Sequence, residues 1–227
     1  GLVGSEMCIR DRLSVELEQY PTEGDLAAFF VLAIDQLDQL ESKHVVDLGA
    51  GNGILGIGCT YLGCSKVTMI EGDLEVAKIA QQNSLEIMPK NNCKIEVVSD
   101  MITSSYDRQI ENADIVVLNP PWGFQTPKAD RPIVDYAFRL QPKVVYVIHS
   151  AKSNHLSKIA KEFGYDCEIV FQSNFRLPPK FAHQSRKMKD TEVKCWRFYL
   201  PGNKKIFADE EESVSYTHLR AHETCTN

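Results

Sequence analysis

The chain has 227 residues, of which 43% are hydrophobic and 25% charged, a size and composition that suit one α/β domain with a substantial core. The net charge of −6 argues against a protein that coats nucleic acid over its whole surface, and no apolar run approaches the roughly 20 residues that a membrane-spanning helix needs. Seven cysteines are scattered without a CxxC pair, which indicates reduced thiols in a cytoplasmic protein and neither a disulfide framework nor a metal site.

The two ends of the chain do not continue the apolar pattern of the region between them. Residues 1–12 and 213–227 resemble translated sequencing-adapter tracts, so we exclude both from the reasoning about the fold. On this interpretation His218 and His222 are not metal ligands. A native disordered tail is the alternative. The expected domain is therefore 13–212.

The first regular element is expected to be a helix that begins near Thr22, where Thr22-Glu23-Gly24-Asp25 resembles a capping box. Apolar residues at helical spacing continue it to about Leu40. Four further helices are predicted, over residues 54–61, 74–87, 132–140 and 156–163. Seven strands are predicted, over residues 45–48, 66–71, 94–98, 113–118, 143–148, 166–171 and 191–199.

Strands alternate with helices until the last two strands. This order predicts a mostly parallel, seven-stranded sheet with helices on both faces. The last two strands lack a helix between them and are expected to form an antiparallel edge hairpin. The sequence therefore predicts a single α/β domain.

The most informative motif is Asn119-Pro120-Pro121-Trp122, which directly follows the apolar strand 113–118. Neither proline can donate a hydrogen bond to a neighbouring strand, so the chain must leave the sheet there. The Asn119 side chain and the Pro120 carbonyl can then accept hydrogen bonds from an amine, and Trp122 offers a face for a planar ring. A plain strand-terminating turn is the alternative. With a glycine-rich loop upstream, we interpret the motif as a catalytic site.

The glycine-rich loop runs from Asp47 through Gly49, Gly51 and Asn52 to Gly53, directly after the first expected strand. The segment 51–56 matches GxGxxG, which binds a dinucleotide pyrophosphate at a helix N-terminus. The longer DxGxGxG pattern fits better, because the Asp47 carboxylate suits a cation. S-adenosylmethionine carries a sulfonium and an ammonium and no phosphate. A tight turn that binds no ligand is a further alternative.

Two acidic residues follow the next expected strands. Glu71 can accept hydrogen bonds from ribose hydroxyls, which serves NAD and S-adenosylmethionine equally. Asp100 can bind an adenine amine, with the Met101 backbone completing the contact, or can be a simple turn residue. The motif 119–122 favours a methyl donor, because a hydride-transfer site has no use for it.

On these residues the chain resembles class I S-adenosylmethionine-dependent methyltransferases of the adenine-N6 group, with their Rossmann-like fold. More closely, it resembles the methyltransferase-like protein 5 family, which modifies an adenosine in small-subunit ribosomal RNA (rRNA). The resemblance covers about 17–200 and is carried by residues 18–22, 47–53, 119–122 and 192–198. It implies S-adenosylmethionine as the cofactor. The implied cofactor-binding residues are Gln19 and Thr22 at its methionine end, Asp47, Gly49, Gly51 and Asn52 at the loop, Glu71 at the ribose, Asp100 and Met101 at the adenine, and Asn119.

The sequence departs from this family at Trp122, where the family usually has phenylalanine. Both rings can stack on a base, so we expect activity to be kept and substrate fit to change. Glutamine-N5 methyltransferases that act on protein release factors share an Asn-Pro-Pro-aromatic segment and are the enzymatic alternative. A non-catalytic scaffold with the cofactor fold is another. The resemblance also implies a partner, a small zinc-binding activator protein that adds a strand to an exposed sheet edge.

A basic stretch near the end of the chain reverses the overall charge locally. It contains no acid and is a candidate RNA-binding loop, although an exposed, solvated hairpin loop is the alternative. Its candidate residues are Arg176, Lys180, His183, Arg186, Lys187 and Lys189. The proposed chemistry requires no histidine, so His149 and His155 are interpreted as structural or RNA-adjacent.

Overall fold

The computed structural model describes residues 24–87, 92–122, 128–176 and 190–203. Five helices and seven strands lie in these ranges, one for each predicted element. The helices are α1 (Gly24–Asp38), α2 (Ile54–Thr60), α3 (Leu74–Ile87), α4 (Arg131–Arg139) and α5 (Leu156–Glu162). The strands are β1 (His44–Leu48), β2 (Lys66–Glu71), β3 (Lys94–Ser99), β4 (Ile115–Leu118), β5 (Val144–Ser150), β6 (Asp166–Arg176) and β7 (Asp190–Tyr199).

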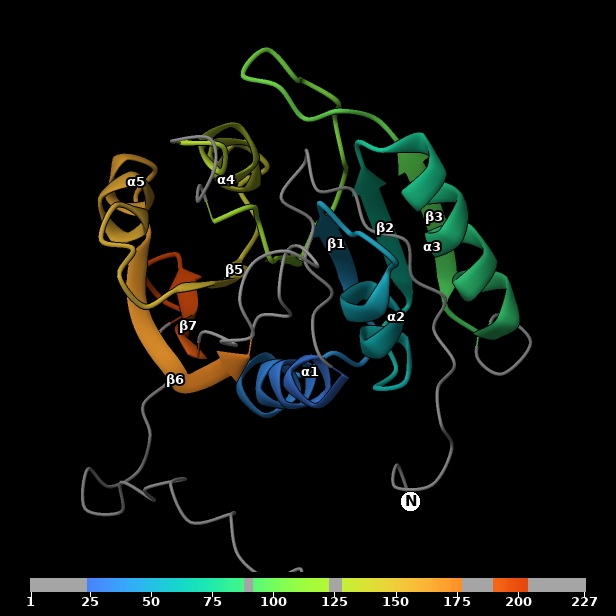
Figure 1. The fold of residues 1–227 in the computed structure, drawn as a ribbon, viewed down its shortest axis with the longest axis horizontal. Coiled ribbons are helices and arrows are strands. Elements are labelled where there is room, and N and C mark those ends of the chain that lie inside the picture. Colours follow the sequence, from blue (N-terminus) through green and yellow to red (C-terminus); the bar gives the residue numbers. More distant parts are fainter. Residues whose placement is uncertain (1–23, 88–91, 123–127, 177–189, 204–227) are drawn as a thin grey trace, which may run out of the picture.

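The seven strands form one sheet in the order β3-β2-β1-β4-β5-β7-β6 (Figure 1). Strands β1 to β5 are parallel, whereas β7 runs antiparallel to both of its neighbours, β5 and β6. The predicted mostly parallel sheet with an antiparallel final pair is therefore confirmed. The chain winds outward from β1 to β3 and returns to β4 on the other side of β1. Open α/β sheets bind ligands outside the carboxyl ends of the strands at such a change of direction.

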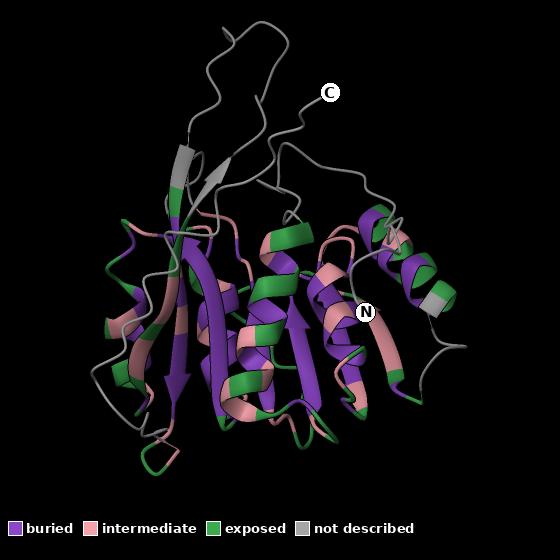
Figure 2. Ribbon diagram, turned by 90° about the horizontal axis from the view of Figure 1, so that it is seen from below, coloured by how far each residue is buried: buried purple, intermediate pink, exposed green. Residues whose placement is uncertain are grey.

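Helices cover both faces of the sheet, as the alternating order predicts. One core cluster joins the sheet to α1, α2 and α3, with Phe30 and Ile34 fully buried. The other joins it to α4 and α5, with Val134 and Phe138 fully buried. Buried residues fill the central strands and the helix faces that contact them (Figure 2). Strands β1, β4 and β5 are buried along their whole lengths, so their ends are rigid supports for the loops that follow.

A buried ion-pair network ties the last two strands to α1. The fully buried Arg197 of β7 donates to both carboxylate oxygens of Asp38, at 2.7 and 2.9 Å, and to Glu168 at 2.7 Å. The Tyr146 hydroxyl of β5 donates to Asp38 at 2.5 Å. Burying a guanidinium is tolerated only when its donors are matched in this way.

Among the helices in the described ranges, none combines the length and the apolar character needed to cross a membrane. The segments 1–12 and 213–227, the Thr22 cap and the loop 177–189 lie outside the described residues. The domain boundaries 13–212 therefore stay a prediction.

Candidate active site

The glycine-rich loop continues β1 and leads directly into α2. The backbone N–H groups of Gly49 and Ala50 donate to the Ile70 carbonyl at 2.8 and 3.1 Å, so the loop starts while still paired to β2. Gly49 and Gly51 have φ values of +66° and +58°, where a side chain is strained. A Cβ at Gly49 would lie 3.0 Å from Ile133 of α4, whereas one at Gly51 would meet nothing within 4 Å. Among the described residues, nothing therefore lies close to this side of the Gly51 backbone, and a ligand can approach it.

Asp47 lies beneath this loop and is 1% exposed. Its Oδ2 accepts a hydrogen bond from the Gly56 N–H at 2.8 Å, which fixes the first turn of α2. Burial raises the pKa of Asp47 from 3.8 to about 7, against the opposing effect of the Gly56 hydrogen bond and with a smaller contribution from the charge of Glu71. Added positive charge near this carboxyl would favour its ionised form.

Glu71 ends β2 and is 5% exposed. Its Oε2 accepts from the Gly51 N–H at 2.8 Å and its Oε1 from the Asp73 N–H at 2.9 Å. Burial raises its pKa, although these backbone hydrogen bonds oppose the shift. Glu71 therefore ties the loops after β1 and β2 together at the carboxyl edge of the sheet.

Asp100 and Met101 follow β3 and lie beside Glu71. The Asp100 N–H donates to the Glu71 carbonyl at 3.0 Å. The Asp100 carboxylate accepts from the Tyr106 hydroxyl at 3.0 Å and from Arg108 at 3.5 Å. Tyr106 and Arg108 were not identified from the sequence, because nothing in their spacing marks them as partners of Asp100.

The motif Asn119-Pro120-Pro121-Trp122 leaves the sheet directly after β4, as predicted. The Trp122 Nε1–H donates to the Asn119 Oδ1 at 3.1 Å. An indole N–H can only donate, so this bond defines which side of the Asn119 amide carries the oxygen. An amide oxygen has two lone pairs and can accept a substrate N–H as well. Phenylalanine at position 122 could not make this hydrogen bond.

The predicted site residues thus lie at the carboxyl ends of four strands that are neighbours in the sheet: β3, β2, β1 and β4. Asp100, Glu71, the loop 49–53 and Asn119 occupy these ends in that order. Gln19 and Thr22 lie outside the described residues, as do Lys180, His183, Arg186, Lys187 and Lys189. Arg176 ends β6, but its side chain likewise lies outside the described part of the chain. The roles given to these residues stay predictions.

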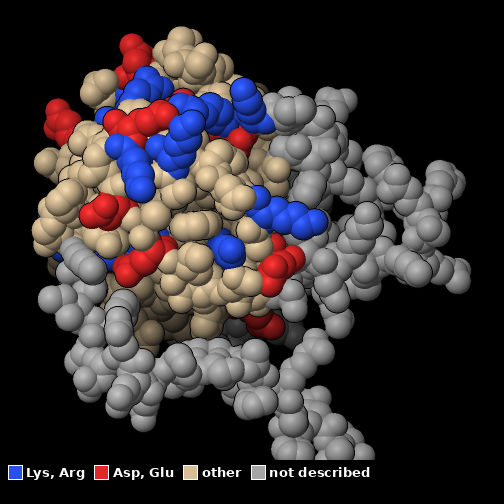
Figure 3. Space-filling view, turned by 90° about the vertical axis from the view of Figure 1, so that its left-hand side faces the viewer, with Lys and Arg blue, Asp and Glu red and all other residues tan. Residues whose placement is uncertain are grey.

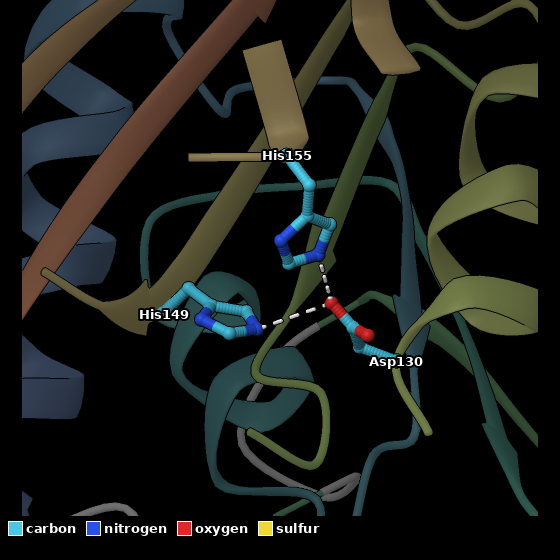
Figure 4. A group of neighbouring side chains, drawn as sticks. All are labelled: Asp130, His149 and His155. Carbon is cyan, nitrogen blue, oxygen red and sulfur yellow. Dashed lines mark hydrogen bonds and ion pairs between the residues drawn. The ribbon is translucent and has the colours of Figure 1, made fainter. Parts of the chain in front are cut away.

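A polar cluster that the sequence did not reveal lies at the end of β5. The Asp130 Oδ2 lies 3.2 Å from the His149 Nε2 and 2.5 Å from the His155 Nε2 (Figure 4). The His149 ring lies beside Trp122, with 6.3 Å between ring centroids. Asp130 is 19 and 25 residues from these histidines in sequence, and no motif spacing links them.

A seven-stranded sheet in this order, with one antiparallel strand beside β5, is the fold of class I S-adenosylmethionine-dependent methyltransferases. A family model described as conserved hypothetical protein 95 matches residues 25–167. The rRNA N(6)-adenosine-methyltransferase Mettl5 of Drosophila melanogaster is 31% identical over 188 residues, which cover 81% of this chain and 87% of that protein. The chain belongs to the family of METTL5-like rRNA N6-adenosine methyltransferases.

Two further relatives agree with this assignment. METTL5 of Danio rerio is 28% identical over 80% of this chain and 88% of its own length. A crystal structure of a candidate RNA methyltransferase from Pyrococcus horikoshii, PH1948, superposes with a TM-score of 0.72 at 31% identity. The superposed region covers 85% of this chain and 93% of the Pyrococcus horikoshii chain. The family resemblance recognised in the sequence is therefore confirmed.

Proposed function

We propose that this protein transfers a methyl group from S-adenosylmethionine to the N6 amine of an adenosine in small-subunit rRNA. The observation that carries the proposal is the place of Asn119: its side-chain oxygen is oriented by Trp122 at the end of β4, next to the glycine-rich loop after β1. Two relatives that match along most of their length, from Drosophila melanogaster and Danio rerio, are named as rRNA N(6)-adenosine-methyltransferases. A candidate protein N5-glutamine methyltransferase of Methanocaldococcus jannaschii is 22% identical and covers only 48% of this chain.

The residues at the strand ends fit a cationic cofactor. Two buried carboxyls, Asp47 and Glu71, have pKa values raised by burial, so a nearby positive charge would stabilise their ionised forms. In the described part of the chain, no atom lies within 4 Å of a Cβ placed on the positive-φ backbone of Gly51. On this proposal the loop 49–52 and Glu71 hold S-adenosylmethionine, with Asp100 and Met101 at its adenine. The cofactor supplies a methyl group activated by the positive sulfonium.

The chain's own contribution is to make a weak nucleophile reactive. The lone pair of an exocyclic adenine amine is delocalised into the ring. Asn119 Oδ1 and the Pro120 carbonyl would each accept a hydrogen bond from one of the two N–H groups of this amine. These bonds would draw the amine nitrogen toward tetrahedral geometry and direct its lone pair at the methyl group. Hydrogen bonding and positioning can together supply several kcal/mol without an ionised base.

Trp122 would hold the target base. Enzymes that modify a base generally take it out of its stack, and stacking on an aromatic ring contributes about 1–3 kcal/mol per base. The indole would then have two tasks, since its face contacts the base while its N–H orients Asn119.

Methyl transfer to small-subunit rRNA by Asn119→Ala tests this proposal. We expect turnover to fall by at least about a hundredfold, as when a transition-state hydrogen bond is lost, while S-adenosylmethionine binding measured by calorimetry is largely kept. The matched control is Asn154→Ala, because Asn154 is exposed and lies outside the proposed contacts. Turnover of Asn119→Ala close to wild type would remove Asn119 from the chemistry.

RNA contact through the basic stretch 176–189 remains part of the proposal. On the side of the molecule formed by α5 and β6, lysine and arginine side chains are mixed with acidic ones (Figure 3). Arg131, for example, pairs with Asp135 at 2.8 Å and with Glu162 at 3.4 Å. Because the described charges on this face are partly balanced, the acid-free stretch is the stronger candidate for binding phosphates.

The family resemblance supports a further proposal, that a small zinc-binding activator protein pairs with an exposed sheet edge. Strand β3 lies at one edge of the sheet, with β2 as its neighbour. The residues of β3 are partly or fully exposed. An edge strand of this kind can accept an added strand from a partner.

A further inference from the structure

Asp130 and His155 occupy the N-cap positions of α4 and α5, yet neither side chain caps its helix. An aspartate at an N-cap usually accepts a hydrogen bond from a backbone N–H of the first helical turn. Here the Asp130 carboxylate instead faces the two imidazoles of His149 and His155. Asp130 is 4% exposed and His149 is 3% exposed. The acceptor that could cap α4 is therefore used to hold two side chains from other segments.

The protonation of this cluster follows from its hydrogen bonds. Burial alone would raise the pKa of Asp130, but the hydrogen bonds from the two imidazoles outweigh it and lower the pKa. Asp130 is thus a carboxylate, which can only accept, so the Nε2 of each ring carries a hydrogen. The Nδ1 of His155 lies 3.0 Å from the Ser153 hydroxyl, which completes the outer arm of the cluster.

The inner arm of the cluster reaches the proposed catalytic motif. His149 ends up beside Trp122 because β5 pairs directly with β4. The two ring centroids are 6.3 Å apart with planes 31° from parallel. The buried Nδ1 of His149 has no hydrogen-bond partner among the described residues. Among the described residues, the bond to Asp130 is therefore the hydrogen bond that helps fix the rotation of this ring, which also packs against Trp122 and His155.

We propose that Asp130 is a positioning residue for methyl transfer, which fixes the His149 ring against Trp122 so that the indole N–H keeps Asn119 oriented. The inference rests on the proposed function. It links four residues by successive contacts, in the order Asp130, His149, Trp122 and Asn119. Of these, only Asn119 and Trp122 are taken to touch the substrate. Asp130 and His149 act through them.

The same three groups could in principle ligate a metal, since their ligand atoms all lie within 4.8 Å of one another. Two ligands on one tetrahedral zinc ion, each about 2.0–2.1 Å from it, lie about 3.3 Å apart. The 2.5 Å between Asp130 Oδ2 and His155 Nε2 is a hydrogen-bond distance. The contact is therefore interpreted as a hydrogen bond from the His155 Nε2–H to the Asp130 carboxylate.

A double-mutant cycle tests the proposal. We expect Asp130→Ala to lower kcat by about tenfold with little change in KM for RNA, because the substrate-contacting residues remain but are less well ordered. In a Trp122→Phe background the indole–Asn119 bond is already absent, so the same change should lower kcat by less than about twofold. Asp130→Asn keeps an oxygen acceptor and should restore part of the loss. Asp135→Ala, on the same helix, is the matched control and should leave kcat unchanged.

A spectroscopic readout keeps this test separate from the proposed function. Trp196→Phe leaves Trp122 as the single tryptophan. In that background Asp130→Ala should lower the fluorescence anisotropy of Trp122, whereas Asp135→Ala should not. An equal loss of kcat in both Trp122 backgrounds, an unchanged anisotropy, or a stoichiometric transition metal that Asp130→Ala removes would each overturn the inference. If Asp130→Ala does not fold, Asp130→Asn is judged by the same criteria. An inactive wild type in which Asp130→Ala still lowers the Trp122 anisotropy would refute the proposed function instead.

Discussion

The buried carboxyl of Asp47 makes a quantitative prediction about stability and pH. Its pKa is raised from 3.8 to about 7 in the folded protein, chiefly because it is buried. Between these two values the folded state holds a proton that the unfolded state has lost. The free energy of unfolding therefore decreases as the pH rises through this window, and the stabilisation present below it is lost above the folded pKa.

The perturbation that isolates this effect is Asp47→Asn. The amide has nearly the same shape and keeps an oxygen for the Gly56 N–H, but it does not titrate. Each pH unit inside the window changes the stability by about 1.4 kcal/mol. From pH 5 to pH 8, the wild type should therefore lose about 3 kcal/mol relative to the variant, most of it below pH 7. Glu71, whose pKa is also raised, is present in both proteins, so its own contribution largely cancels.

Urea denaturation followed by circular dichroism at pH 5, 6, 7 and 8 measures this difference. Asp107→Asn is the matched control, since Asp107 is exposed and its removal should leave the pH profile unchanged. A wild-type-minus-variant difference that stays constant from pH 5 to pH 8 would refute the reasoning. It would mean that Asp47 is already ionised in the folded protein at pH 5.

Three further predictions concern the rest of the chain. Asp38→Ala should destabilise the fold by about 3–5 kcal/mol in urea denaturation, because the fully buried Arg197 loses its bidentate partner; a loss below 1 kcal/mol would contradict this. Neutralising Arg186, Lys187 and Lys189 together should weaken RNA binding and flatten its dependence on salt, and unchanged affinity would favour a solvated loop. Co-expression with the proposed activator should yield a heterodimer in size-exclusion chromatography, and separate elution of the two proteins would count against the pairing at β3.

Much of the candidate site could be predicted because parallel strands end at the same edge of a sheet. The alternating order of strands and helices implies that the residues after the first four strands meet at that edge. The sequence pattern alone therefore brings the loop 49–53, Glu71, Asp100 and Asn119 into one region. The strand-ending prolines are equally informative, since they force the chain out of the sheet directly after β4.

The remaining features depend on contacts that no local pattern records. Asp130 looks like an ordinary residue before a helix, and only the packing of α4 and α5 against the end of β5 brings it to His149 and His155. Strand β6 extends to Arg176, beyond the predicted end at residue 171. Its polar extension, from Gln172 to Asn174, interrupts the apolar pattern. Such residues are tolerated because β6 is an edge strand.

The most direct test of the account is the chemical identity of the methylated product. The protein is incubated with isotopically labelled S-adenosylmethionine and small-subunit rRNA, and the RNA is then digested to nucleosides and analysed by mass spectrometry. We predict label in N6-methyladenosine that disappears with Asn119→Ala. A folded protein that binds the cofactor but leaves adenosine unlabelled would contradict the account.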